Sequence, residues 1–283
     1  MKSSFDIGVL GPLHLRSGDS IPTPTAPKER ELLALLLMNS GRVVPISTMI
    51  DELWPERPPK TAITALQTYV LNIRRSLSIA LGLHGPDVRT ELLLTKNKGY
   101  VFHTETCDFD LTQYHDLVLA GRRALRDGER NLAVGLLRQA EGLWRGAPLS
   151  DVDQGSPLRA EIAGLEQSRS AARALRIQAE LHLGHHQFLL AELAELTAEY
   201  PFDENLHGSY MEALRRSGRR DKALEVYQRL HRSMAEQIGL EPCQELQILR
   251  REIERSLAPA PEYERSVPCG FPASSITVSR YPT

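Results

Sequence analysis

Apolar residues recur with helical spacing from Thr61 to Leu77, and the segment has two faces of different character. One face is apolar and predicts packing on a core; it carries Leu66, Val70, Ile73 and Leu77. At about 100° per residue, the opposite face carries Thr61, Thr64, Thr68, Leu71, Asn72 and Arg75, with Gln67 and Arg74 on the flank. Such polar side chains can read base edges and hold phosphates, and an exposed Leu can contact a thymine methyl. An ordinary solvated surface helix is the alternative.

The segment before this helix predicts a shorter helix followed by a proline-rich turn. Its apolar side consists of Met49, Ile50, Leu53 and Trp54. Ser47 is expected to cap its amino end, and the prolines from Pro55 to Pro59 prevent its continuation. A short helix, a turn and a long helix form the order of a helix-turn-helix motif, whose second helix enters the major groove. An ordinary helical hairpin has the same order.

Residues 91–104 predict a β-hairpin, because two short apolar runs flank a polar turn. The tip consists of Lys96, Asn97, Lys98 and Gly99. Lysines at this place suit the wing of a winged helix, which reaches the phosphate backbone or minor groove beside the recognition helix. Lysines at hairpin tips are also common as protection against edge-to-edge association.

The residues before the helix-turn-helix fit the same domain. Short strands are expected in residues 5–16 and around Ile21, followed by a helix from Pro27 to Asn39 and a short strand at Arg42 to Val44. Pro27 suits a first helical turn and Gly41 follows the helix end. The predicted order is therefore strands, helix, short strand, helix, helix, hairpin.

The character of the chain changes near Cys107 to Asp110. Beyond it, helical patterns follow one another with short Gly, Pro or Asp breaks, at about residues 111–127, 129–144, 157–184, 187–199, 203–217, 219–237 and 242–257. Gly184 and Gly218 lie 34 residues apart, with matching apolar positions after each, and a looser copy begins at Gly128. Such a period is that of tetratricopeptide repeats, which stack into a continuous core with a concave groove. The groove predicts recognition of a protein or ligand; a purely structural stack is the alternative.

The length of 283 residues allows two domains with substantial cores. We expect an α+β winged helix-turn-helix domain over 1–105, an all-α tetratricopeptide-like array over 106–257 and a disordered tail over 258–283, which is rich in Pro, Ser and Gly. The net charge is only −2, but residues 60–98 carry +4. Weak overall charge implies modest non-specific affinity for DNA, so specific binding needs base contacts, more than one protomer, or both.

Several features that resemble enzyme or metal chemistry are discounted. His182, His185 and His186 fall at an expected helix break, where polar residues belong, and three cysteines without paired spacing fit a reducing compartment. The sequence contains no phosphate-binding GxxxxGK[ST] loop, GxSxG elbow, HExxH pair, membrane-length apolar run or secretory leader. We therefore expect a soluble, cytoplasmic, non-enzymatic protein with no catalytic residues, bound metal or cofactor.

Four segments together resemble a known family. Residues 26–44, 51–77 and 92–102 are similar to the OmpR-type winged-helix DNA-binding domain, and more closely to the Streptomyces antibiotic regulatory protein family of transcriptional activators. Residues 206–246 resemble the bacterial transcriptional activation domain of the same regulators. One departure is the wing, which in this family often has a Pro- or Gly-rich turn and here reads Lys-Asn-Lys.

The resemblance implies a role for each candidate residue. Base-facing positions would be Gln67, Thr68, Leu71 and Asn72; positions near phosphates or on the wing would be Thr64, Arg74, Arg75, Lys96, Asn97 and Lys98. It also implies a nucleoid-associated, pathway-specific activator of a secondary-metabolite (antibiotic) gene cluster. Such a protein would bind direct repeats in double-stranded promoter DNA as a homodimer or tandem protomers and recruit RNA polymerase holoenzyme. A tetratricopeptide-type adaptor and a ligand-gated repressor are the alternatives.

Overall fold

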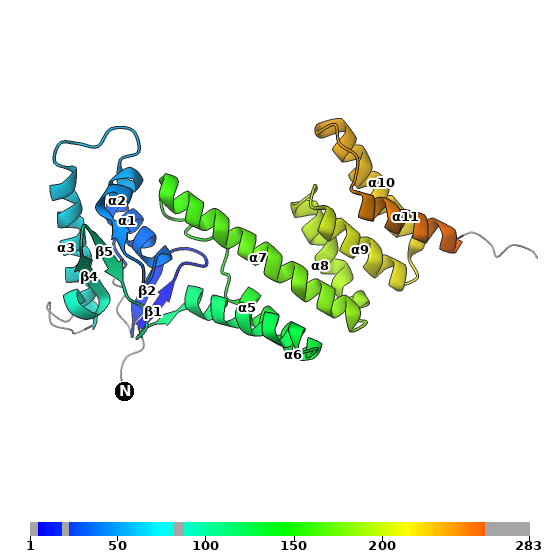
Figure 1. Ribbon diagram of the computed structural model, residues 1–283, viewed down its shortest axis with the longest axis horizontal. Helices are drawn as coiled ribbons and strands as arrows, with labels where there is room; N and C mark the ends of the chain where they lie inside the picture. Colours follow the sequence, from blue (N-terminus) through cyan, green and yellow to red (C-terminus); the bar gives the residue numbers. More distant parts are fainter. Residues whose placement is uncertain (1–4, 19–22, 82–87, 258–283) are drawn as a thin grey trace, which may run out of the picture.

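The computed structural model describes residues 5–18, 23–81 and 88–257, which form a mixed α/β region followed by a helical array (Figure 1). The elements of the first region are β1 (Phe5–Gly8), β2 (His14–Ser17), α1 (Pro27–Met38), β3 (Val44–Pro45), α2 (Ile46–Leu53), α3 (Ala62–Leu81), a π-helical turn η1 (Val88–Leu92), β4 (Leu93–Lys96) and β5 (Gly99–Phe102). The fold class and this order of elements are confirmed. The expected strand around Ile21 and the expected tail over 258–283 lie outside the described residues.

The strands form two small sheets. In one, β1 lies between β2, which is antiparallel to it, and the short strand β6 (Asp108–Phe109), which is parallel to it. In the other, β5 lies between β3 and β4 and is antiparallel to both. The pairing of β1 with β6 was not predicted, because a two-residue strand leaves no periodic signal. It joins the start of the chain to the entrance of the helical array.

The expected cap of α2 is wrong. The residue that precedes the helix is Pro45, in an extended conformation and without a side-chain cap, so Ser47 lies inside the first turn. The cause is the short strand β3, which carries the chain directly into the helix: the amide of Ile46 donates to the carbonyl oxygen of Lys98 at 3.0 Å. A backbone acceptor on the hairpin thus satisfies a donor at this helix end.

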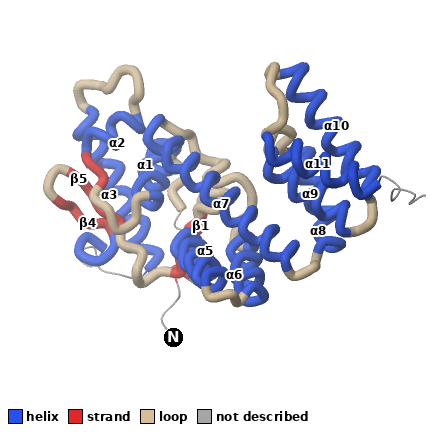
Figure 2. The backbone as a smooth tube through the Cα atoms, turned by 45° about the vertical axis from the view of Figure 1, so that its right-hand side comes forward, coloured by secondary structure: helices blue, strands red, loops and turns tan. Residues whose placement is uncertain are grey.

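The array contains α5 (Asp110–Arg126), α6 (Arg130–Gly142), α7 (Ser156–His182), α8 (His186–Glu199), α9 (Glu204–Arg216), α10 (Arg220–Gln237) and α11 (Gln244–Leu257), each within a few residues of its predicted bounds. Figure 2 shows strands confined to the first region and helices joined by loops beyond it. In both views α3 lies at the end of the molecule opposite α10 and α11 (Figures 1 and 2).

The glycines that suggested the repeat have one structural role. Gly128, Gly184 and Gly218 adopt φ of +82°, +81° and +74° in the turns α5–α6, α7–α8 and α9–α10. In each turn the amide after the glycine bonds back five residues, as from Glu129 to the carbonyl oxygen of Ala124. Glycine is favoured at this left-handed position because it has no Cβ. The predicted repeat is therefore confirmed as three helical pairs that end their first helix in the same way.

The hydrophobic core does not divide at the expected boundary near residue 105. One cluster of buried side chains runs from Phe5 through the helix-turn-helix and continues through Tyr114, Leu137 and Leu165 to Ala172. Two smaller clusters follow, one among α7, α8 and α9 and one among α9, α10 and α11. The winged helix and the start of the array are thus packed around the same core.

Candidate nucleic-acid interface

The two faces expected for the long helix are present in α3. The apolar side chains of Leu66, Val70, Ile73 and Leu77 are all buried, with at most 1% exposed. The opposite face is exposed and carries Thr64, Gln67, Thr68, Leu71, Asn72 and Arg75, and Thr61 is exposed in the turn just before the helix. Leu71 keeps 51% of its surface exposed, so its side chain is accessible to a partner. This surface therefore presents hydrogen-bond donors and acceptors together with exposed apolar side chains, Leu71 among them.

The short helix α2 fixes the orientation of α3. Trp54, at the end of α2, stacks on Tyr69 of α3 with ring centroids 6.3 Å apart and planes 27° from parallel. Both side chains are half-buried against the core. Below them, Met49 and Leu53 are buried in the same core as the inner face of α3. The exposed face of α3 is thus held in place by packing before any partner binds.

Arg74 lies apart from the other candidate residues, because it is half-buried between α3 and the hairpin. Its guanidinium donates to the carbonyl oxygen of Leu93 at 3.0 and 2.6 Å and to Oγ1 of Thr95 at 3.0 Å, and its Cζ lies 5.6 Å from the centroid of the Tyr100 ring. Burial lowers the pKa of Arg74 from its ordinary value. Arg74 thus ties α3 to β4, and its proposed role near a phosphate stays a prediction.

The hairpin tip is exposed at Lys96, Asn97 and Lys98, as expected for a wing. Lys98 has φ of +60°, a left-handed conformation that is unfavourable for a residue with a Cβ. The tip is anchored to the helix-turn-helix because the carbonyl oxygen of Lys98 accepts from Ile46. Gly99 is required beside it, since a Cβ there would collide with the carbonyl oxygen of Val44.

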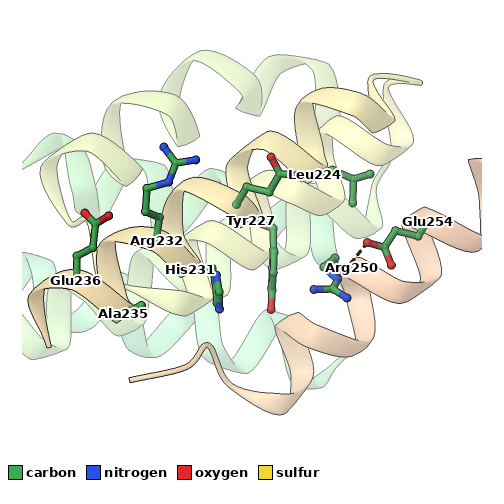
Figure 3. A pocket seen from close by; sticks show the side chains of 9 residues that line it. Leu224, Tyr227, His231, Arg232, Ala235, Glu236, Arg250 and Glu254 are labelled. Atoms are coloured by element: carbon green, nitrogen blue, oxygen red, sulfur yellow. Dashed lines mark ion pairs between the residues drawn. The ribbon is translucent and has the colours of Figure 1, made fainter. Parts of the chain in front are cut away.

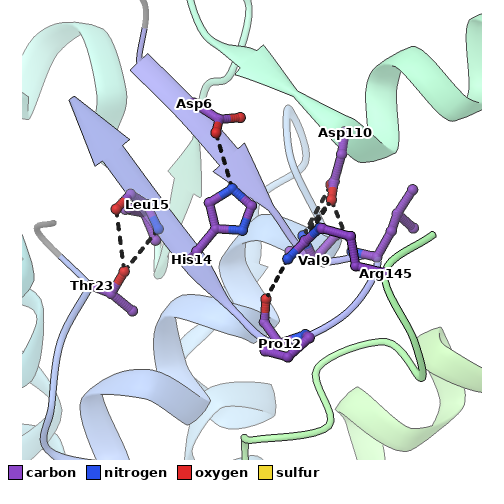
Figure 4. A network of polar contacts seen from close by, with 9 residues as sticks. Asp6, Val9, Pro12, His14, Leu15, Thr23, Asp110 and Arg145 are labelled. Atoms are coloured by element: carbon purple, nitrogen blue, oxygen red, sulfur yellow. Dashed lines mark hydrogen bonds and ion pairs between the residues drawn. The ribbon is translucent and has the colours of Figure 1, made fainter. Parts of the chain in front are cut away.

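The winged helix is bonded to the array at its β1 end (Figure 4). The Asp110 carboxylate, at the start of α5, accepts from the amides of Val9 and Leu10 at 3.0 Å. Arg145 donates to the same carboxylate at 3.0 Å and to the carbonyl oxygen of Pro12 at 3.2 Å. The amide of Arg145 also donates to the carbonyl oxygen of Leu10 at 2.7 Å. These bonds supplement the shared core and make the relative placement of the two regions specific.

A second connection runs from α1 and α2 to the start of α7. The Glu52 carboxylate accepts from the amides of Gly155 at 2.6 Å and Leu158 at 2.9 Å. Asp151, just before α7, accepts from the amide of Leu13 at 2.8 Å and pairs with Arg30 of α1. Sequence reasoning missed Glu52, and no periodic signal could have revealed it, since its partners lie about a hundred residues away in the chain.

A hollow of about 400 Å³ lies between α10 and α11 (Figure 3). In its wall Tyr227 lies between His231, whose ring is nearly parallel at 6.1 Å, and Arg250, whose Cζ lies 5.2 Å from the ring centroid. Arg250 pairs with Glu254 at 3.2 Å and His231 with Glu241 at 2.7 Å. None of the residues that line the hollow is a Ser, Thr or Cys nucleophile.

The clustered histidines and Cys107 have local structural contacts in the described part of the chain. No group of three His, Cys, Asp or Glu side chains there is placed to hold a metal ion. His182 Nδ1 lies 2.7 Å from the carbonyl oxygen of Gln178, and the His185 ring meets Phe188 edge-on. Burial raises the pKa of the Cys107 thiol to about 11, which disfavours the reactive thiolate.

In the described part of the chain, no helix combines the length and the apolar character that crossing a lipid bilayer requires.

Comparison with known proteins identifies both regions. Residues 109–254 match the family model of the bacterial transcriptional activator domain, and residues 22–102 match that of the C-terminal domain of transcriptional regulatory proteins. Regulatory protein DnrI of Streptomyces peucetius is 38% identical over 275 residues, which cover 97% of this chain and 100% of that protein. Regulatory protein AfsR of Streptomyces griseus is 34% identical over 94% of this chain, but this chain covers only 27% of that protein.

A solved structure has the same architecture. The structure titled Mycobacterium tuberculosis EmbR in complex with a low-affinity phosphopeptide superposes with a TM-score of 0.81 at 30% sequence identity. The similarity covers 91% of this chain and 67% of that chain. At this identity the likeness extends over both the winged helix and the helical array.

Proposed function

Because this chain belongs to the Streptomyces antibiotic regulatory protein family of transcriptional activators, we propose that it activates transcription by placing the exposed face of α3 in the major groove of promoter DNA. The family consists of transcriptional regulators, and the match to a DNA-binding regulator domain implies promoter DNA as a partner. The observation that carries the proposal is the exposed polar face of α3, held rigid by the Trp54 to Tyr69 stack and flanked by the lysines of the hairpin.

Within this interface the residues divide by chemistry. Gln67, Thr68, Leu71 and Asn72 read base edges, because amide, hydroxyl and apolar groups match the major-groove pattern. The phosphate and wing contacts come from Thr64, Arg74, Arg75, Lys96, Asn97 and Lys98. Arg74 contributes mainly by holding the wing, since its guanidinium is already bonded to Leu93 and Thr95. Its neighbour Arg75 is exposed, and its guanidinium is accessible to a phosphate on this side of α3.

The whole chain acts on a short direct repeat upstream of a promoter for antibiotic biosynthesis, occupied by two protomers in tandem. The near-neutral net charge of −2 supports this arrangement, because one protomer gains little non-specific affinity for DNA. Two linked binding sites raise the overall affinity well above that of either site alone. The array, whose first three helices share the core of the winged helix, presents a surface that recruits RNA polymerase holoenzyme. Rigid coupling supports this role, since DNA binding then fixes where the array lies on the promoter.

The decisive experiment is selection of bound duplexes from a randomised pool, followed by a gel shift with the selected sequence. We expect two half-sites separated by about one helical turn, two successive shifted species, and retardation that survives excess non-specific DNA. A footprint with polymerase should then extend to the promoter only when the chain is present. Binding with no sequence preference would refute the proposal and favour a protein-interaction adaptor; specific binding that excludes polymerase would favour a repressor.

A further inference from the structure

Asn72, on the exposed face of α3, is held by a residue of another helix. Its Nδ2 donates a hydrogen bond of 2.7 Å to Oε1 of Glu29, in the first turn of α1. The cations next to Glu29 on α1 are engaged elsewhere, because Lys28 pairs with Glu31 and Arg30 with Asp151. The Glu29 carboxylate is therefore directed at the recognition helix and not at a cation of its own helix.

This bond selects one orientation of the Asn72 amide. An asparagine side chain can turn either its oxygen or its nitrogen toward a neighbour, whereas an ionised carboxylate only accepts hydrogen bonds. Glu29 thus holds the orientation in which Nδ2 faces α1. Oδ1 and the second hydrogen of Nδ2 then remain for another partner. That acceptor and donor, side by side, match the N6 amino group and N7 of adenine in the major groove.

We infer that Glu29 is a positioning residue for base recognition, which fixes the Asn72 amide in the orientation that reads adenine. The inference rests on the proposed function, because it requires the exposed face of α3 to meet base edges. Because the Asn72 amide is held before binding, little conformational entropy is lost when it contacts DNA. The bond also disfavours the flipped amide, which would suit other bases. Glu29 carries the same sign of charge as the phosphates, so it supports specificity while opposing non-specific attraction.

The test uses the full chain and the duplex selected from the randomised pool. The base pair at which Asn72→Ala loses discrimination is found first, and affinities for all four bases there are then compared. The wild-type chain is expected to prefer adenine about tenfold or more. Glu29→Gln and Glu29→Ala should each lose roughly fivefold to tenfold of that preference, whereas their affinity for unrelated duplexes should not fall, because a negative charge near the phosphates is removed. Added to Asn72→Ala, either change should cause no further loss.

Asp51→Asn is the matched control, because it removes one exposed charge from α2 and leaves the bond between Glu29 and Asn72 intact. Unchanged thermal unfolding in all variants confirms that only recognition is altered. Wild-type discrimination in both Glu29 variants would overturn the inference. A loss of base preference at a different base pair would also overturn it, because Glu29 would then contact a base directly and would not act through Asn72. A wild-type chain that selects no sequence refutes the proposed function itself, a result that is visible without any variant.

Discussion

Glu52 of α2 closes the amino end of α7, with its carboxylate 2.6 Å from the amide of Gly155. The first amides of a helix have no partner within it and carry a partial positive charge, so a carboxylate is well suited to this place. Only 1% of Glu52 is exposed, and its second oxygen accepts from Leu158. A residue of the helix-turn-helix thus serves as the cap of the longest helix in the array.

Replacing Glu52 should destabilise the whole protein. Glu52→Ala leaves two buried amides without acceptors and is expected to lower the free energy of unfolding by about 2 to 4 kcal/mol. Glu52→Gln keeps one acceptor oxygen and should cost roughly half as much. Urea unfolding measures both, with Asp51→Ala on the exposed side of α2 as the control, expected to stay within about 0.5 kcal/mol of wild type. A Glu52→Ala variant as stable as this control would contradict the capping role.

The close approach of Gly155 to the backbone of Glu52 can be tested by an alanine substitution, with Gly164 of α7 as the comparison. A Cβ at Gly155 would lie 2.5 Å from the carbonyl oxygen of Glu52, so Gly155→Ala should destabilise by about 1 to 3 kcal/mol. Gly164, in the interior of α7, has no atom within 4 Å of such a Cβ. Gly164→Ala should therefore stabilise by roughly 0.5 to 1 kcal/mol, because alanine is the better helix former. Thermal unfolding of the two variants should shift in opposite directions; a shift of the same sign in both would argue against the tight contact.

Base and phosphate contacts should separate by their dependence on sequence and salt. Gln67→Ala or Asn72→Ala should weaken specific binding by about 1 to 3 kcal/mol and relax preference at one base pair. Lys96→Gln and Lys98→Gly should weaken all duplexes alike and reduce the slope of log affinity against log salt by about one for each phosphate that the variant no longer neutralises. Glycine suits position 98 because of its φ of +60°. Gel shifts at several salt concentrations measure both effects. Uniform weakening by Asn72→Ala would contradict base reading.

Arg74 and Arg75 are adjacent in sequence but should respond differently to substitution. Arg74→Met removes the bonds to Leu93 and Thr95 and should lower stability by about 1 to 2 kcal/mol. Arg75→Met removes only an exposed charge, so stability should change by less than about 0.5 kcal/mol while DNA affinity falls. Urea unfolding and gel shifts on the same preparations compare the two. Equal stability of both variants would show that Arg74 does not tie the wing to α3.

The sequence predicts those structural features that depend on neighbouring residues or on a regular spacing of residues. The faces of α3 follow from the spacing of Leu66, Val70 and Ile73, and the repeat follows from glycines that must adopt positive φ. The bonds of Glu52 and Glu29 could not be predicted, because their partners are distant in sequence and a charged residue on a helix is usually solvated. Helical spacing places Arg74 on the flank of the polar face, but the hairpin that covers this residue determines its partners.

The array contains a buried ionic network that should make its stability depend on pH. Glu180 of α7 is fully buried and accepts from Arg138 at 2.7 Å and Arg176 at 2.8 Å. Burial alone would raise the pKa of Glu180, but the hydrogen bonds from the two arginines lower it overall from its ordinary value of 4.5. The unfolded chain then binds the proton more readily, so the stabilisation is present above about pH 4.5 and is lost as the pH falls through the folded pKa. Glu141 in the same network has a raised pKa, chiefly because of burial, and acts in the opposite direction.

Glu180→Gln isolates this contribution, because Glu141 and Glu192, which also pair with Arg176, remain in the variant. At neutral pH the change should destabilise by about 3 kcal/mol, since it removes one partner of a buried pair. Between about pH 5 and pH 3 its stability should fall less steeply than that of wild type, because the titrating group is gone. Urea unfolding at a series of pH values gives both quantities. Glu195→Gln on the exposed side of α8 is the control and should follow the wild-type profile. If Glu180→Gln and wild type lose stability in parallel as the pH falls, the two arginines do not lower the pKa of Glu180 in the folded protein.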